Sequence, residues 1–235
     1  MPKNKTSSLN ITVNGASQNF PATKIFNSND IRLAKCRTVN IAANSHDVPI
    51  YGFSFESDAG VIVDNFSFRG ISGIEMDNFK EDYLTALQNT RPYDLLIIHY
   101  GPNLLFKPEL VDFAWYGRKM ETVLKKIKAG FPQTSILIVS TADKGYKYSG
   151  VWQTEKGVLP LIDVQYEIAR QAKFDFFNLF NAMGGKNQIV KWVQADPPLA
   201  NKDYTHVNGR GARKIAEILF TQIMNEFNEY KKLGN

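Results

Sequence analysis

Short apolar runs bounded by turn residues dominate the first quarter of the chain. Residues 9–15, 17–26, 30–44 and 48–57 alternate apolar and polar positions or form brief apolar stretches, without a helical repeat over three turns. The pattern predicts several short strands joined by polar turns, arranged as a small β-sandwich or half jelly roll. Because a region of about 45 residues lies close to the lower limit for independent folding, we expect it to pack on the rest of the chain.

From residue 60 onward the pattern changes to compact apolar runs that alternate with longer amphipathic stretches. The apolar runs lie at residues 60–68, 93–101, 134–143 and 174–180. Apolar positions at helical spacing lie at residues 78–90, 108–131, 157–173 and 208–230. This alternation predicts an α/β domain with a parallel sheet covered by helices on both sides. We therefore expect a β-rich region at residues 1–58 and an α/β domain at residues 59–235.

Composition narrows the classes of function without choosing among them. The formal charge is +5 and the pI is about 9.1, but Lys and Arg are spread along the chain, so we predict no nucleic-acid partner. The single cysteine, Cys36, excludes an internal disulfide, and no Cys/His spacing is typical of a metal site. No run of about 18 apolar residues occurs, so we predict no membrane span. No phosphate-cradling loop or dinucleotide fingerprint is present, and we predict no cofactor.

The loop before the last helical stretch contains Asp203 and His206 in the sequence "DYTH". A carboxylate three residues before a histidine can reach the imidazole Nδ1 across one tight turn, which leaves Nε2 available as a general base. The alternative is that Asp203 or Asn208 caps the following helix and that His206 merely lies in its first turn. The functional interpretation also needs a nucleophile nearby.

Two further loops follow predicted strands, at the sheet edge where open α/β folds gather their functional residues. In "HYGPN", Asn103 can aim its amide across the top of the sheet as a donor to an oxyanion. In "NFSFRGISG", Gly70 or Gly73 allows close backbone approach and offers a bare N–H. Taken singly, the Asn103 loop is better explained as ordinary turn chemistry, and the Gly70 loop is explained equally well in that way.

A few other residues are weaker candidates for substrate contact. Arg69 and Asp143 lie at strand ends, where they are candidates to line a cleft, with loop packing as the alternative. Trp152, in the polar loop "YKYSGVWQTEKG", is a candidate to stack on a sugar ring.

Taken in order along the chain, Gly70, Asn103, Asp203 and His206 resemble the SGNH (GDSL-type) hydrolase family. The segments "GVIVDNFSFRGISG", "STADKGYKYSGVW" and "NAMGGKNQIVKWVQADPPLANKDYTHVNGRGARKIAEIL" are similar to secreted bacterial peptidoglycan and polysaccharide O-acetylesterases, over about residues 51–230. The resemblance implies a flavodoxin-like three-layer αβα sandwich. It also implies an oxyanion hole formed by Gly70 and Asn103, a catalytic pair of Asp203 and His206, and a carbohydrate-binding-module-like origin for the β-rich region.

The Ser-bearing block of that family, Gly-Asp-Ser followed by a helix, does not occur in this sequence. The segment "NSHD", with Ser45 beside His46 and Asp47, is better explained as a turn, because a triad converges in space rather than in sequence. We expect the chain to be the C-terminal part of a longer, periplasmic or secreted esterase, inactive by itself. Its expected partner is an acetylated polysaccharide or peptidoglycan. A catalytically silent glycan-binding relative and an O-acyltransferase remain the alternatives, and no oligomeric state is predicted.

Overall fold

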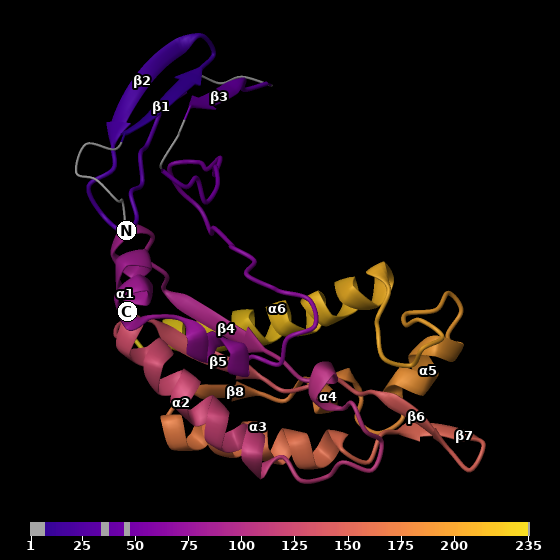
Figure 1. The fold of residues 1–235 in the computed structure, drawn as a ribbon. Coiled ribbons are helices and arrows are strands. Elements are labelled where there is room, and N and C mark those ends of the chain that lie inside the picture. Colours follow the sequence, from indigo (N-terminus) through magenta and orange to yellow (C-terminus); the bar gives the residue numbers. More distant parts are fainter. Residues whose placement is uncertain (1–7, 34–37, 45–47, 235) are drawn as a thin grey trace. The chain divides into compact units, whose positions relative to one another are not determined.

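The computed structural model describes residues 8–33, 38–44 and 48–234 (Figure 1). The chain divides into two compact units. The N-terminal unit consists of Met1–Ser67 and Phe79–Tyr93, and the C-terminal unit consists of Phe68–Asn78 and Asp94–Asn235. The chain therefore passes between the units three times. The predicted turn at Ser45 to Asp47 and the single cysteine lie outside the described residues.

A three-stranded antiparallel sheet in the order β2-β1-β3 forms the start of the N-terminal unit. Its strands are β1 (Ser8–Val13), β2 (Ala16–Pro21) and β3 (Ile41–Asn44). Between β1 and β2 the chain turns at Asn14 and Gly15, whose φ angles of 48° and 87° suit the Asn-Gly pair of a two-residue hairpin. Ile11 and Val13 are buried, as the alternating pattern requires. The prediction of short strands is confirmed for these three, whereas residues 48–57 form no strand.

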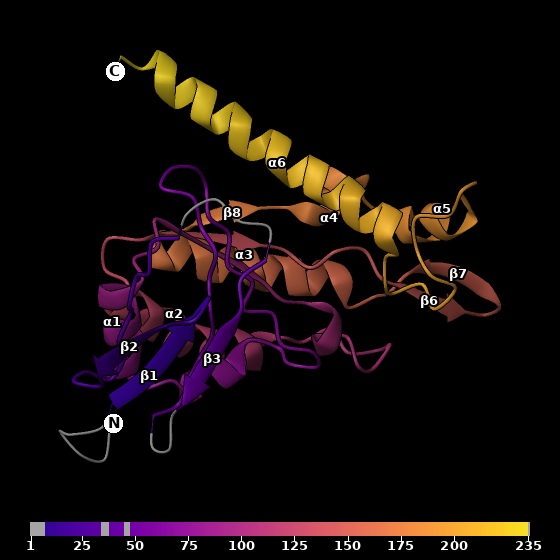
Figure 2. The same cartoon turned by 90° about the horizontal axis from the view of Figure 1, so that it is seen from above.

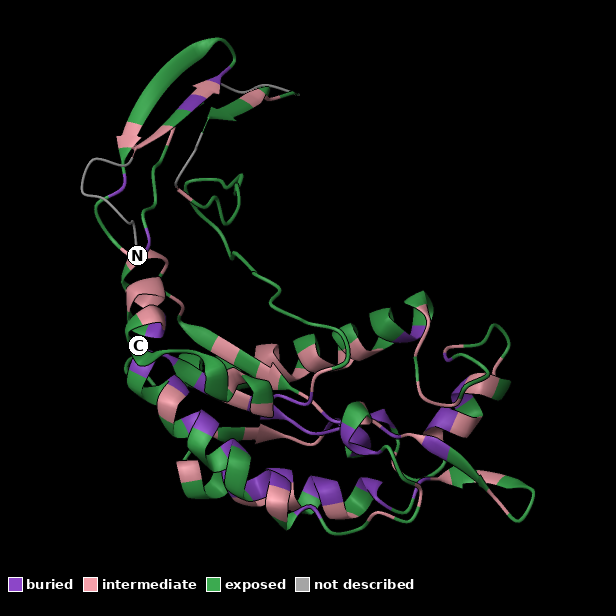
Figure 3. Ribbon diagram, in the orientation of Figure 1, coloured by how far each residue is buried: buried purple, intermediate pink, exposed green. Residues whose placement is uncertain are grey.

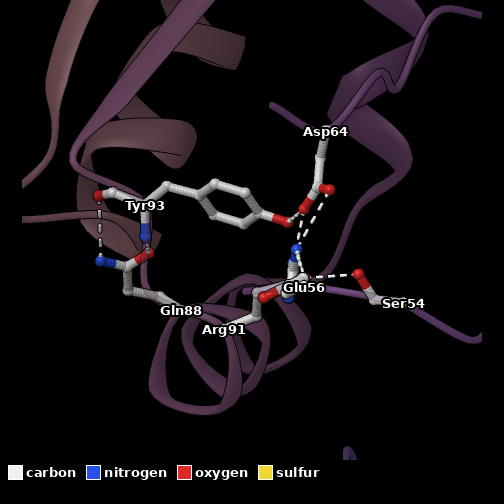
Figure 4. A network of polar contacts seen from close by, with 6 residues as sticks. All are labelled: Ser54, Glu56, Asp64, Gln88, Arg91 and Tyr93. Atoms are coloured by element: carbon white, nitrogen blue, oxygen red, sulfur yellow. Dashed lines mark hydrogen bonds and ion pairs between the residues drawn. The ribbon is translucent and has the colours of Figure 1, made fainter. Parts of the chain in front are cut away.

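Polar contacts tie the rest of the N-terminal unit to the end of helix α1 (Glu81–Thr90). Arg91 lies between two carboxylates: its Nε is 2.5 Å from Asp64 Oδ2, and its terminal nitrogen is 2.6 Å from Glu56 Oε1 (Figure 4). The Tyr93 hydroxyl also donates to Asp64, over 2.7 Å. The hydrogen bonds from Arg91 and Tyr93 hold the pKa of Asp64 below its ordinary value. The segment that contains Glu56 and Asp64 is thus held to the end of α1 by ion pairs and hydrogen bonds.

The prediction of a buried strand at residues 60–68 is wrong. This apolar run forms no strand, and its side chains are exposed, with Val61 at 92% (Figure 3). Phe66 and Phe68 are also exposed. A strand needs a neighbouring strand to satisfy its backbone groups, and none in the described part of the chain pairs with this run. The apolar sequence therefore lacks the partner that would bury it.

The C-terminal unit is built on a parallel sheet in the order β4-β5-β8. The strands are β4 (Leu95–His99), β5 (Ser135–Val139) and β8 (Asp175–Phe177), each within a predicted apolar run. In register, Leu95 lies opposite Ser135 and Leu137 opposite Asp175. The α/β fold class predicted from the sequence is confirmed for this unit.

Helices cover the two faces of this sheet (Figures 1 and 2). The helices of this unit are α2 (Ala114–Gly130), α3 (Val158–Ala172), α4 (Leu179–Met183), α5 (Gln188–Gln194) and α6 (Gly209–Lys232), of which α5 lies beyond the end of the sheet (Figure 1). One core cluster joins Val139 of β5 to buried residues of α4 and α5 and to partly buried residues of α6. The predicted helix at 108–131 begins only at Ala114, whereas the predicted α3 and α6 agree with the structure to within two residues. No helix among the described residues is long and apolar enough to span a membrane.

The outer edge of the sheet is open at β4. Within the described part of the chain, β4 pairs with a strand on one side only. Its residues Leu95 and Ile97 are exposed, although strands of parallel sheets are ordinarily buried on both faces. On α6, Phe220 and Phe227 are exposed as well. The β4 edge and the exposed face of α6 are therefore apolar surfaces of this unit, of the kind that proteins usually cover.

A hairpin projects beyond the sheet in the segment that the sequence pattern assigns to a polar loop (Figure 1). It consists of β6 (Gly145–Tyr148) and β7 (Val151–Thr154). The chain turns at Ser149 and Gly150, both with positive φ. Of the expected loop, only this turn and residues 155–157 lie outside the two strands.

Candidate active site

Asp203 and His206 form a hydrogen-bonded pair within one turn of the chain. The Asp203 Oδ2 atom lies 2.9 Å from His206 Nδ1, and Oδ1 accepts the backbone N–H groups of Thr205 and His206, each over 2.9 Å. Burial raises the pKa of Asp203. The hydrogen bonds together lower this pKa by more than burial raises it, so the pKa lies below its ordinary value. An ionised Asp203 favours the His206 tautomer with the proton on Nδ1, which leaves Nε2 free to accept a proton. The His206 side chain is 73% exposed.

The cap of helix α6 is Asn208 and not Asp203. Asn208 Oδ1 accepts the N–H groups of Arg210 and Gly211, over 2.9 and 3.2 Å. The alternative in which Asp203 serves the helix terminus is therefore wrong, while the one naming Asn208 is correct. The carboxylate of Asp203 is directed to His206, as general-base chemistry requires.

The loop that carries Asn103 is joined to the loop that carries Gly70. Asn103 lies in the short 3-10 helix η2 (Pro102–Leu104), and its Nδ2 donates to the backbone oxygen of Ile71 over 2.8 Å. One amide hydrogen is therefore used to join the loops, and the other remains for a ligand. Gly70 has a φ of 83°, which favours glycine, and open space around its Cα. Arg69 beside it is exposed.

Gly73, rather than Gly70, is the position of close approach. A Cβ atom there would lie 2.6 Å from the Tyr100 ring. Glu75, in the 3-10 helix η1 (Ile74–Asn78), accepts the N–H groups of Ser72 and Gly73 over 3.0 and 2.9 Å. The segment from Gly70 to Glu75 therefore lies against Tyr100, which follows β4. The loops that carry Gly70 and Asn103 are thus in contact with each other.

Gln165 fastens the ends of β4 and β5 together, and sequence reasoning missed it. It lies on α3 with 2% of its surface exposed. Its Nε2 donates to the Tyr100 oxygen over 2.7 Å, and its Oε1 accepts the Thr141 N–H over 2.8 Å. Gly101 packs so closely on Thr141 that a Cβ atom would lie 2.2 Å from the Thr141 hydroxyl. The clamp thereby fixes the turn that precedes Asn103.

Asp143 is buried and links neighbouring segments through hydrogen bonds. Its carboxylate accepts the Thr154 hydroxyl and the Ile189 N–H, each over 2.8 Å, and burial raises its pKa despite these hydrogen bonds. Trp152 stacks on Tyr204, within the D-Y-T-H loop, with ring centroids 3.8 Å apart. The segment from Thr141 to Gly145 thus connects the Asn103 side of the site to the His206 side.

No serine among the described residues hydrogen-bonds to His206 Nε2. In the C-terminal unit, Ser72 is bonded to Glu75, and Ser140 is buried against backbone groups of its surroundings. No group of three His, Cys, Asp or Glu side chains in the described ranges is placed to hold a metal ion. The described residues therefore include a candidate acid-base pair and candidate oxyanion donors, and leave the nucleophile unassigned.

No protein-family model matches the sequence, and no curated protein sequence matches it significantly. Among solved structures, the chain is similar to a peptidoglycan O-acetylesterase, at 20% identity and a TM-score of 0.69, over 95% of this chain and 62% of that one. The chain therefore shares the α/β fold of that esterase. It spans less than two thirds of that esterase's length.

Two other esterase structures align less closely. A carbohydrate esterase of family 3 from Talaromyces cellulolyticus is 13% identical, with a TM-score of 0.47 over 68% of this chain and 70% of that one. A GDSL-like lipase from Bacteroides thetaiotaomicron is 16% identical, with a TM-score of 0.42 over 67% of this chain and 72% of that one.

Proposed function

We propose that this chain supplies the acid-base and oxyanion parts of a serine esterase that removes O-acetyl groups from a polysaccharide or peptidoglycan. The observation that carries the proposal is the Asp203–His206 pair, whose exposed Nε2 has no partner among the described residues. A hydrogen-bonded, ionised Asp203 beside the imidazole is the arrangement that makes a histidine a general base.

The nucleophile in this proposal is a serine on a segment outside the given sequence, added as a strand at the open edge of β4. Two observations support this placement. Leu95 and Ile97 of β4 are exposed at an unpaired edge, and the similar esterase has more than a third of its length outside the matched region. The added segment would place its serine at the carboxyl ends of the strands, where the candidate residues lie.

The chemistry is acyl transfer in two steps. The serine oxygen attacks the acetyl carbonyl carbon while His206 Nε2 takes its proton, and the Gly70 N–H and Asn103 amide stabilise the oxyanion. The tetrahedral intermediate then releases the sugar oxygen, which receives the proton from His206. Water, deprotonated by His206, next attacks the carbonyl carbon of the acetyl-serine ester. The bond to the serine oxygen breaks, the serine takes the proton back from His206, and acetic acid is released and ionises. Because an acetylated wall or matrix polymer lies outside the cytoplasm, the whole protein would be periplasmic or secreted.

The test compares this chain with a form extended by its upstream coding sequence, using p-nitrophenyl acetate and acetylated peptidoglycan. We expect turnover only in the extended form. Asn103→Ala in that form should lower kcat by about 100-fold or more, the scale for one lost oxyanion donor. Asn225→Ala, at an exposed position of α6, is the matched control and should leave kcat unchanged.

The outcomes separate this proposal from its alternatives. Turnover by the short chain contradicts the absence of the nucleophile, and a near-normal kcat in the Asn103 variant contradicts the oxyanion assignment. Binding of the glycan without turnover by the extended form favours a silent glycan-binding protein. Transfer of acetyl groups to an added sugar acceptor in preference to water identifies an acyltransferase.

A further inference from the structure

Tyr204 occupies a strained backbone position in the middle of the candidate catalytic pair. Its φ is 55°, in the left-handed region that non-glycine residues rarely adopt. This turn brings Asp203 Oδ1 within 2.9 Å of the backbone N–H groups of both Thr205 and His206. Such a conformation persists only where its surroundings hold it, so the contacts of Tyr204 bear on the geometry of the pair.

The hairpin of β6 and β7 makes those contacts. The Gly145 N–H donates to the Tyr204 oxygen over 2.7 Å, and the Trp152 ring lies parallel to the Tyr204 ring, at 8° and 3.8 Å between centroids. In the hairpin register Gly145 pairs with Thr154 and Lys147 with Trp152, so Gly145 and Trp152 share one face. A Cβ atom on Gly145 would lie 2.9 Å from Tyr204 Cβ, so only glycine admits this approach.

The hairpin is itself anchored in the interior. The Thr154 hydroxyl donates to the buried Asp143, and it accepts the Asn187 N–H over 2.7 Å. The Thr154 N–H in turn donates to Asn187 Oδ1 over 2.9 Å. The face that supports Tyr204 is therefore fixed to the segment after β5 and to the start of α5.

We infer that Trp152 is a positioning residue, which holds Tyr204 by stacking and thereby keeps Asp203 and His206 in hydrogen-bonding geometry. The stack covers one face of the Trp152 ring, so this role differs from that of a sugar platform. The positioning role deepens the proposed esterase function and rests on it for its chemical meaning. The contacts that carry it all lie within this chain.

The test is NMR spectroscopy of the chain as given, without ester or added serine. Long-range proton-nitrogen spectra of neutral His206 report which ring nitrogen carries the proton, and hydrogen exchange reports the Thr205 and His206 amides. We expect the Nδ1–H tautomer and protected amides in the native chain. Trp152→Ala should shift His206 toward the Nε2–H tautomer and accelerate exchange of both amides roughly fivefold, within the range one aromatic pair supplies.

Three variants make the test specific. Val151→Ala alters an exposed residue on the opposite face of the same hairpin and should leave both signals unchanged. Trp152→Phe keeps a ring and should have a smaller effect than alanine. Tyr204→Leu removes the stack from the other side and should reproduce the alanine result, which also serves if Trp152→Ala does not fold. Unchanged amide signals from β4 and β5 establish that a variant is folded.

A native tautomer and native exchange in folded Trp152→Ala or Tyr204→Leu would overturn the positioning role. That result leaves the esterase proposal standing, because it involves no turnover. Conversely, an inactive extended protein with the expected NMR changes rejects the esterase function and leaves the positioning contact intact.

Discussion

Replacing Gln165 with leucine tests the clamp between the ends of β4 and β5. Gln165 is 2% exposed and pairs with the Tyr100 oxygen and the Thr141 N–H. Leucine fits the volume but leaves both backbone groups buried and unpaired, at about 1–3 kcal/mol each. The gain from burying leucine offsets about 1–2 kcal/mol of this loss. We therefore expect Gln165→Leu to lower the free energy of unfolding by about 3 kcal/mol.

Tryptophan fluorescence during urea unfolding measures the stability of the C-terminal unit, which contains Gln165. All three tryptophans lie in the C-terminal unit, so the signal reports that unit directly. Gln171→Leu on the same helix is the matched control, because Gln171 is exposed, and it should change stability by less than about 0.5 kcal/mol. Equal unfolding midpoints for the Gln165 variant and the native chain would refute the clamp.

Two further predictions concern charged groups. Lys144→Met should destabilise the C-terminal unit by about 3 kcal/mol or more. The Glu155 side chain is 1% exposed and has no hydrogen-bond donor of good geometry, so this substitution leaves it buried without its ion-pair partner. Lys156→Met, at an exposed pair, should change the same urea midpoint little, and equal effects of the two variants would contradict the argument. The lowered pKa of Asp203 means that its stabilising contribution is complete above the unfolded value, about 3.9, and is lost as the pH falls through the lower folded value. A carbon-13 titration of Asp203 should therefore have its midpoint below that of free aspartate, with the Thr205 amide shifting at the same pH, and a midpoint at or above it would contradict the hydrogen-bond pattern.

Local sequence patterns predicted two kinds of feature: elements with a clear apolar run or helical spacing, and contacts between residues that are close in sequence. The strands β4 and β5 and the helices α3 and α6 follow directly from apolar runs and helical spacing. The pairing of Asp203 with His206 needs only a three-residue turn, so its spacing was sufficient. The same reasoning failed at residues 60–68, because an apolar run predicts a strand only when another strand lies beside it.

The features that the sequence did not reveal depend on contacts between distant segments. A single glutamine on an amphipathic helix carries no signal, and Gln165 acquires its role only because two strand ends meet beside it. The β6–β7 hairpin did have a local signal. Ser149 and Gly150 separate two short runs rich in aromatic and β-branched residues, a pattern that indicates a two-residue turn.

The arrangement separates the parts of the candidate site by how they are held. The hydrogen bonds within the Asp203–His206 pair come from its own loop, and that loop is supported from outside by the β6–β7 hairpin and by Trp192 of α5. The oxyanion candidates are likewise held by η1, α3 and the end of β5. None of these contacts requires a strand beyond β4. The proposed acid-base pair and the proposed oxyanion donors are therefore each held by contacts within this chain, as the esterase proposal requires.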